Sequence, residues 1–290
     1  MQNIRLVALI IVLSVNHFTC FSQRSGFTQF FFAPVNLNPS FTGADGQASM
    51  GLAYQKRWSG IPGAPTTFAL NFHAPINNRL GLGASVSNYE RGPVTNTDIQ
   101  VLSSYEIPFG THQYVRFGLS LGASSNAIDF NQLGDFANDP AVQSALEKNM
   151  NLLGSAGLSL HLKSFHFGFT LPNLFTPVYL PGKSFEVTEV NPLQTMVVHM
   201  SNRFYFAKDK NLFEPYLVYR ISKDLKPQLE AAGLLHLNHA VWVGSSYKQD
   251  FGISALAGIK TNNKLAIGFS YSLKNSGENE LNAPSFEVQL

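Results

Sequence analysis

One serine in this chain stands in a pattern that many hydrolases use for their nucleophile. Gly118-Leu119-Ser120-Leu121-Gly122 matches G-x-S-x-G, in which the serine needs a strand, a sharp turn and then a helix. Here the pattern lies inside a run where apolar residues alternate with small or polar ones, which is typical of a continuous strand. We therefore predict that Ser120 is a strand residue, that no residue is catalytic, and that the protein is not an enzyme. The alternative, a hydrolase, predicts that activity is lost in Ser120→Ala.

Histidines form two pairs that each lie on either side of a predicted turn, His161 with His166 and His236 with His239. A metal site needs a third or fourth ligand at suitable spacing, and neither pair has a nearby Asp or Glu to supply it. We interpret them as turn histidines at a membrane–water boundary. The sequence predicts no metal site, no cofactor site and no cofactor, and it assigns no residue to partner binding.

Several cationic residues lie in segments where apolar and polar residues alternate as in strands. Their side chains could project into a space that the strands enclose. They could set the selectivity of a channel, or they could pair with carboxylates on neighbouring strands, and we favour pairing. The cations are Lys56, Arg57, Arg116, Arg203 and Arg220, and the carboxylates are Glu106, Glu214 and Glu230.

Aromatic residues fall mostly toward the ends of the predicted strands. This placement is typical of the aromatic girdles at the two interfaces of a membrane barrel. A carbohydrate-stacking groove is the alternative. The residues are Tyr54, Trp58, Phe68, Phe72, Tyr216, Tyr219, Trp242, Tyr247 and Tyr271.

Alternation with a period of two is the dominant signal in the whole chain. The face opposite the apolar one carries mostly Gly and Ser, as in residues 80–87 and 265–273, and this suits a lumen better than bulk water. We predict an all-β fold, a transmembrane antiparallel β-barrel of the outer membrane with about 14 strands. The predicted strands are 47–58, 65–75, 79–90, 95–108, 112–125, 149–162, 164–171, 193–207, 213–222, 226–237, 239–248, 252–261, 264–274 and 283–290.

The predicted connections alternate in length. Bacterial barrels have short periplasmic turns and longer external loops, and the longest connections, 126–148 and 172–192, both follow odd-numbered strands. We expect both on the cell exterior. Within the first, Asp139 and Pro140 suit the start of a short helix over 139–148, and the second holds four prolines and is expected to be irregular.

Composition and the N-terminus agree with export to a membrane. Only 13% of the 290 residues are charged and the net charge is +2, so nothing indicates a nucleic-acid partner. Arg5 followed by the apolar run 6–15 predicts a signal peptide over 1–22. Cys20, the only cysteine, would leave with it; a lipid anchor on Cys20 is the alternative, but the preceding residues make a poor lipobox. No later segment has about 20 uninterrupted apolar residues, so no transmembrane helix is predicted.

The mature chain divides into two predicted parts. Residues 23–46 form a turn-rich segment with four phenylalanines, Phe27 and Phe30 to Phe32, and it contains Pro34 and Pro39. It is too rich in proline for a strand. We expect it to pack into or under the mouth of the barrel, which occupies residues 47–290.

A resemblance to a known family extends from Asn38 to Gly92, from the turn-rich segment into the first predicted strands of the barrel. Asn38-Pro39-Ser40-Phe41-Thr42-Gly43 resembles a segment found near the mature N-terminus of the PorP/SprF family. The resemblance continues through Gln55, Arg57 and Trp58, through residues 63–67, and through Gly81-Leu82-Gly83 to Gly92. It departs from the family pattern at Lys56 and Arg57, and at the last residue, Leu290.

The resemblance implies a function that the fold alone does not. Members of this family are implied to be non-enzymatic outer-membrane components of type IX secretion in Bacteroidota. They would anchor or assist the export of cell-surface proteins, including gliding adhesins, that carry a type B C-terminal signal. The implied partners are outer-membrane lipid, such a secreted protein with its C-terminal sorting domain, and other secretion components. The alternative is a passive porin or solute channel.

Overall fold

The fold is described from a computed structural model, which covers residues 26–129, 150–179, 186–223, 225–261, 264–272 and 283–290. These residues form strands and two short 3₁₀ turns, η1 (Pro34–Asn36) and η2 (Pro39–Phe41). The strands are β1 (Ser49–Lys56), β2 (Thr66–Pro75), β3 (Leu80–Arg91), β4 (Val94–Gly110), β5 (Gln113–Ile128), β6 (Met150–Leu162), β7 (Phe165–Leu171), β8 (Phe175–Tyr179), β9 (Glu186–Val190), β10 (Thr195–Asn202), β11 (Phe204–Phe206), β12 (Asn211–Ser222), β13 (Leu225–Leu237), β14 (Val241–Lys248), β15 (Gly252–Thr261), β16 (Leu265–Ser272) and β17 (Ser285–Gln289).

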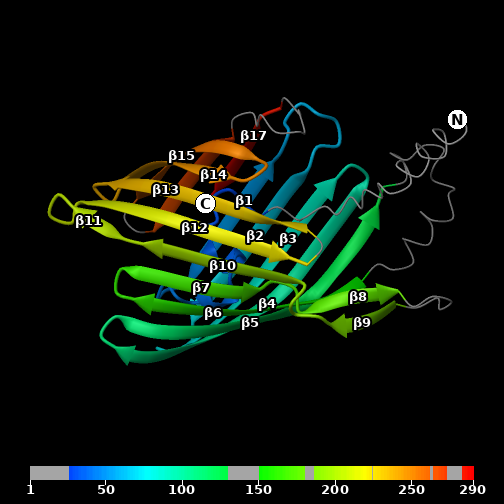
Figure 1. The fold of residues 1–290 in the computed structure, drawn as a ribbon, viewed down its shortest axis with the longest axis horizontal. Coiled ribbons are helices and arrows are strands. Elements are labelled where there is room, and N and C mark those ends of the chain that lie inside the picture. Colours follow the sequence, from blue (N-terminus) through cyan, green and yellow to red (C-terminus); the bar gives the residue numbers. More distant parts are fainter. Residues whose placement is uncertain (1–25, 130–149, 180–185, 224, 262–263, 273–282) are drawn as a thin grey trace, which may run out of the picture.

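The sheet closes on itself, and every pairing in it is antiparallel (Figure 1). β1 pairs with β2 on one side and with β17 on the other, and β10 pairs with both β7 and β12. β10 and β11 follow one another against β12, interrupted only at Arg203, and β8 with β9 forms a separate two-stranded sheet. Counting β10 and β11 as one strand gives a closed barrel of fourteen strands, which confirms the predicted fold.

The two faces of the barrel have the polarity of a membrane protein. Ile99 and Val101 of β4 are 58% and 64% exposed, whereas Asp98, Ser104 and Arg116 are buried in the interior. Polar groups inside and apolar groups outside are the arrangement that a lipid environment selects. Among the described residues, no helix is long and apolar enough to span a membrane.

The connections at one end are tight turns, for example residues 76–79, 111–112 and 163–164, and we call this the turn-bearing end. His112 and Lys163 both have positive φ there, as short hairpins require. The other end carries the connections 57–65, 129–149 and 172–194, and we call it the loop-bearing end.

Two predictions about the long loops have different outcomes. The connection at 172–192 is more regular than predicted, because β8 and β9 pair as a hairpin that lies beside the barrel (Figure 1). Prolines do not prevent this pairing, since a two-stranded ribbon consists only of edge strands. The predicted helix at 139–148 lies outside the described residues.

Candidate functional site

The interior of the barrel holds the chain's own N-terminal segment. Residues 26–48 are here called the luminal segment. They contact side chains or backbone carbonyls of strands all around the barrel, among them β1, β2, β4, β6, β7, β10, β14 and β17. The segment starts at Gly26, whose carbonyl accepts a hydrogen bond of 3.1 Å from Arg57 just past β1, at the loop-bearing end. It reaches the turn-bearing end at Gly43, beside Gly81. The predicted packing of this region against the barrel is therefore confirmed, and the segment runs through the lumen.

Glu287 of β17 holds the start of the luminal segment. Its carboxylate accepts the backbone N–H groups of Thr28 at 2.7 Å and Gln29 at 2.9 Å. The side-chain amides of Gln55 and Gln289 also donate to it, each at 2.7 Å. All four partner groups are hydrogen-bond donors, and an ionised carboxylate, which only accepts, suits them. Glu287 is only 1% exposed, so this anchor is a buried one.

Phenylalanines of the luminal segment pack on an apolar part of the inner wall. Phe30 packs with Val197 and Val218, and Phe31 lies edge-on to Trp242 with ring centroids 5.6 Å apart. Here the wall is lined by apolar residues of β10 and β12 to β15: Val197, Val218, Ala232, Leu234, Trp242 and Leu256.

This packing corrects part of the predicted aromatic girdle. Trp242 is 5% exposed and faces the lumen, and the Tyr216 ring is 5.9 Å from that of Phe30. The girdle prediction puts both residues on the outer face because they lie toward strand ends. In the structure they face inward, where the phenylalanines of the luminal segment cover them. Others of the set do lie on the exposed outer face: Phe68, Phe72, Tyr219, Tyr247 and Tyr271.

The residues that carry the family resemblance, Asn38 to Gly43, lock the luminal segment to the wall, and we call them the lock motif. Asn38 caps η2, because its side-chain oxygen accepts the Ser40 backbone N–H at 2.9 Å. Its side-chain nitrogen donates to the Leu158 carbonyl at 3.1 Å and lies 3.1 Å from Nε2 of His199. Ser40 donates to the hydroxyl of Ser159 at 2.9 Å.

The end of the lock motif is bound in the same way. The carbonyl of Thr42 accepts a hydrogen bond of 2.6 Å from the Ser104 hydroxyl, and the Gly43 N–H donates to Nδ1 of His73 at 3.1 Å. Gly43 has φ +66°, and a Cβ there would meet the Ala74 carbonyl. Glycine is therefore required at this position by both conformation and space.

Glycines on the wall make room for the lock motif. A Cβ on Gly157 would overlap the Asn38 side-chain oxygen, and one on Gly118 would overlap the backbone of Pro39 and Ser40. The first glycine of the G-x-S-x-G pattern thus permits close approach of the luminal segment. Ser120 itself lies within the continuous strand β5, where it donates to Gln100 at 2.8 Å and lies 2.6 Å from the Ser155 hydroxyl.

His161 and His166 lie on either side of the turn at residues 163–164, as predicted, but both side chains face the lumen. His161 and His166 are close, with ring centroids 4.4 Å apart, and His199 joins them at 5.2 Å from His166. Phe41 of the lock motif packs against this cluster, 4.9 Å from His166. The cluster forms because β6, β7 and β10 are adjacent and these positions face inward.

The other predicted pair is not a pair. His236 faces the lumen with its Nε2 atom 3.8 Å from the Glu214 carboxylate, whereas His239 is exposed in the following turn. Within the described residues, no group of three or more His, Cys, Asp or Glu side chains is placed to hold a metal ion.

The predicted pairing of charges inside the barrel is confirmed for three arginines. Arg116 lies 3.7 Å from Glu106, Arg203 lies 3.0 Å from Glu214, and Arg220 lies 3.0 Å from Glu230. Lys248 also contacts Glu230, at 2.9 Å.

Arg57 is a fourth arginine of this interior. Burial lowers its pKa to about 10, against the opposing effect of the acidic groups Tyr89 and Glu287. It donates to Gln55 at 3.0 Å and lies 5.0 Å above the ring of Phe251. It therefore stays charged at neutral pH and joins β1 to the start of the luminal segment.

Two central residues of this site, Glu287 and His199, were not identified from the sequence. Both lie in strands where polar and apolar residues alternate, at positions that face inward. The alternation therefore indicates which face each side chain occupies, but not what it contacts. Their partners Gln29 and Asn38 lie 258 and 161 positions away, and nothing local indicates such contacts.

Several solved structures share the barrel shape at low similarity. The CymD monoaromatic hydrocarbon channel has 13% identity and a TM-score of 0.48, covering 92% of this chain and 91% of that one. The Acinetobacter baumannii outer membrane protein Omp33 has 8% identity and a TM-score of 0.47, covering 84% and 97%. The KdgM porin has 9% identity and a TM-score of 0.37, covering 82% and 96%. Likenesses of this size say nothing about function.

Sequence comparisons give a more specific result. No curated protein matches the chain significantly. The family model described as "Type IX secretion system membrane protein PorP/SprF" matches residues 19–290, which is nearly the whole chain. The resemblance noted in the lock motif thus extends through every strand of the barrel, and the protein belongs to the PorP/SprF family of type IX secretion system membrane proteins.

Proposed function

We propose that the protein anchors or assists the export of secreted surface proteins, including gliding adhesins, that carry a type B C-terminal signal. The observation that carries this proposal is the lumen: the family's own motif fixes the luminal segment across it. A barrel built to pass solutes has no need of such a lock. One that serves as a platform for another protein gains rigidity from it.

The two ends of the barrel suit different partners. The loop-bearing end, with the long connections 129–149 and 172–194, faces the cell exterior in this proposal and holds the secreted protein at the surface. The turn-bearing end faces the periplasm and contacts other secretion components. An N-terminal signal peptide over residues 1–22 takes the chain to the outer membrane.

The role is non-enzymatic in this proposal. Among the described residues, Ser120 of β5 has no histidine as a hydrogen-bond partner; it bonds instead with Gln100 of β4 and Ser155 of β6. A serine nucleophile needs an adjacent general base. Ser120→Ala should therefore leave surface export at the parental level.

A passive channel is the alternative function. It predicts steady ion conductance from the purified protein and no obligate protein partner. The packing of Phe30, Phe31 and the lock motif inside the barrel weighs against it.

A deletion strain tests the proposal. Proteins at the cell surface and in the culture supernatant are compared with those of the parent, and the expected result is the loss of one or more large surface proteins that carry a C-terminal sorting domain. Loss of a single one would indicate a dedicated partner, and loss of all sorted proteins together would indicate a core component. An unchanged set of surface proteins would reject the proposal.

A further inference from the structure

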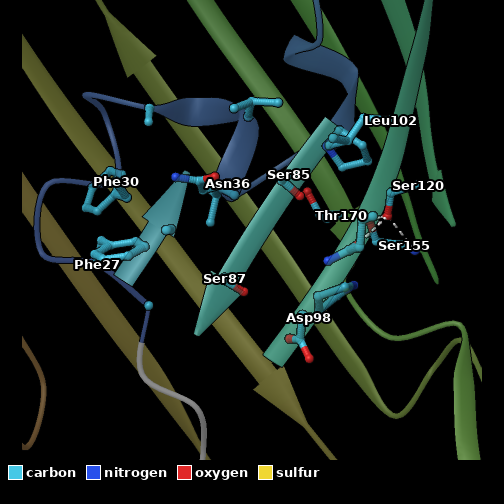
Figure 2. A pocket seen from close by; sticks show the side chains of 18 of the residues that line it. Phe27, Phe30, Asn36, Ser85, Ser87, Asp98, Leu102, Ser120, Ser155 and Thr170 are labelled. Atoms are coloured by element: carbon cyan, nitrogen blue, oxygen red, sulfur yellow. Dashed lines mark hydrogen bonds between the residues drawn. The ribbon is translucent and has the colours of Figure 1, made fainter. Parts of the chain in front are cut away.

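A cavity of about 270 Å³ remains in the lumen between the luminal segment and strands β2 to β7 (Figure 2). Thr67, Tyr89 and Pro172 are among its lining residues. Each of them lies at the end of a strand where the chain enters or leaves a connection of the loop-bearing end. The lock motif closes the lumen in the opposite direction. The cavity is therefore a blind pocket that reaches toward the loops.

The two sides of the cavity differ in chemistry. The barrel side presents hydroxyl and amide groups from four neighbouring strands: Ser85 and Ser87 of β3, Gln100 of β4, Ser120 of β5 and Ser155 of β6. The luminal segment presents mostly apolar side chains: Phe27, Phe30, Ala33, Val35 and Leu37. Figure 2 shows Phe27 and Phe30 on one side of the space, facing Ser85 and Ser87 on the other. An occupant must therefore be polar along one edge and apolar along the other.

The charge of the lining is balanced. Among the described residues that line it, only Asp98 and Arg220 are charged, and Arg220 is already paired with Glu230. A phosphate or another strongly charged ligand would find no concentration of opposite charge here.

We propose that this cavity binds an extended, uncharged peptide segment of the exported protein, which enters from the loop-bearing end. A peptide backbone supplies alternating donors and acceptors to the polar wall, and its small apolar side chains pack on Val35, Leu37 and the two phenylalanines. An oligosaccharide would also satisfy the hydroxyls and stack on Phe27 and Phe30. A peptide is preferred because the proposed partner at the loop-bearing end is an exported protein, and the second experiment distinguishes the two. The inference rests on the proposed function, since it identifies where the exported protein is held.

The first experiment fills the cavity. Ser87→Phe adds a phenyl group at the polar wall, and Ala84→Phe places the same group on the exposed outer face of the same strand as a matched control. The surface proteins that depend on the chain are first defined with the deletion strain. We expect their display to fall to about a tenth or less in Ser87→Phe, equivalent to at least 1.4 kcal/mol of binding, and to stay parental in Ala84→Phe. Parental display in Ser87→Phe would overturn the inference and leave the proposed function intact.

The second experiment does not depend on how well the phenylalanine variant assembles. Ser87→Cys and Ala84→Cys are made in a chain whose only native cysteine is removed by Cys20→Ala. Intact cells are treated with a membrane-impermeant maleimide, and labelling is compared between cells that produce the dependent surface proteins and cells that lack them. We expect Ser87→Cys to be labelled at least about tenfold more slowly when these proteins are present, and Ala84→Cys to show no such difference. Equal labelling of Ser87→Cys in both kinds of cell, whether the cavity is empty or holds a glycan, would overturn the inference. If the deletion strain loses no surface protein, the proposed function itself fails and the inference fails with it.

Discussion

The carboxylate of Glu287 accepts the backbone N–H of Gln29 at 2.9 Å, although the two residues lie 258 positions apart in the chain. This contact joins the last strand of the barrel to the start of the luminal segment. Because the carboxylate also binds Thr28, Gln55 and Gln289, several contacts at the start of the luminal segment converge on one buried side chain.

Glu287→Gln should loosen the start of the luminal segment while the barrel stays closed. The new amide NH₂ would face N–H donors, and each hydrogen bond to a charged group contributes about 1.5–3 kcal/mol. We expect hydrogen exchange at the amides of Thr28 and Gln29 to accelerate by at least about tenfold, as measured by mass spectrometry on the protein in detergent. Glu90→Gln, at an exposed position, is the control. Unchanged exchange at both amides would show that Glu287 is not the anchor.

Gly157→Ala should displace the lock motif, because the added methyl group would overlap the Asn38 side-chain oxygen. Overpacking of this kind is unfavourable by about 1–3 kcal/mol. We expect lower stability to urea and faster exchange over residues 38–43. Ala156→Val adds volume on the outward face of the same strand and should change neither. Equal effects of the two substitutions would contradict the close packing at Gly157.

The intact protein should show no steady open-channel conductance in a planar lipid bilayer, because the luminal segment crosses the lumen. Removal of residues 26–46 should open a pore. The double variant Asn38→Ala/Glu287→Gln serves as a second test should the truncated chain fail to assemble, and it should show frequent transient openings. Steady conductance from the intact protein would favour the passive channel.

Glu230→Gln should destabilise the barrel more than Arg203→Gln. Glu230 neutralises both Arg220 and Lys248 at 3.0 and 2.9 Å, and removing one partner of a buried ion pair costs about 3–5 kcal/mol. The side chain of Arg203 is 54% exposed, against 16% for Arg220, so water can replace its role in part. Urea unfolding in lipid vesicles measures the difference. Equal midpoints would show that Glu230 is better solvated than its contacts indicate.

The fluorescence of Trp242 should be insensitive to brominated lipids, since its side chain lies in the lumen. The chain has two tryptophans, and Trp58→Phe leaves Trp242 as the only one. Adding Tyr271→Trp to a Trp58→Phe/Trp242→Phe chain places a tryptophan on the exposed outer face, where strong quenching is expected. Strong quenching of Trp242 would place it in the girdle after all.

The fold could be predicted because alternation is a local property of each strand. Val101 and Phe117 face outward and Arg116 faces inward, as the period of two requires. The inward position of Arg116 also made its pairing with Glu106 predictable, since the two strands are neighbours along the chain.

The orientation of Trp242 could not be predicted in the same way. Much of the inner face is small and polar, but part of it on β10 and β12 to β15 is apolar, and Phe30, Phe31 and Phe32 cover that part. Alternation separates two faces and does not say which one meets lipid. The histidine cluster could not be predicted either, because it depends on strand pairing that is not local. His199 lies beside His166 only because β10 pairs with β7, and residues 172–194 separate these strands in the chain.

The position of Glu287 in β17 also bears on how the protein is made. The luminal segment is synthesised first, yet its anchor belongs to the last strand, and β17 completes the barrel by pairing with β1. The lumen can therefore be filled in its final form only once the C-terminal strand has arrived. A chain that stops before β17 would have neither a closed wall nor a fixed interior, so correct filling of the lumen reports that synthesis and closure are complete.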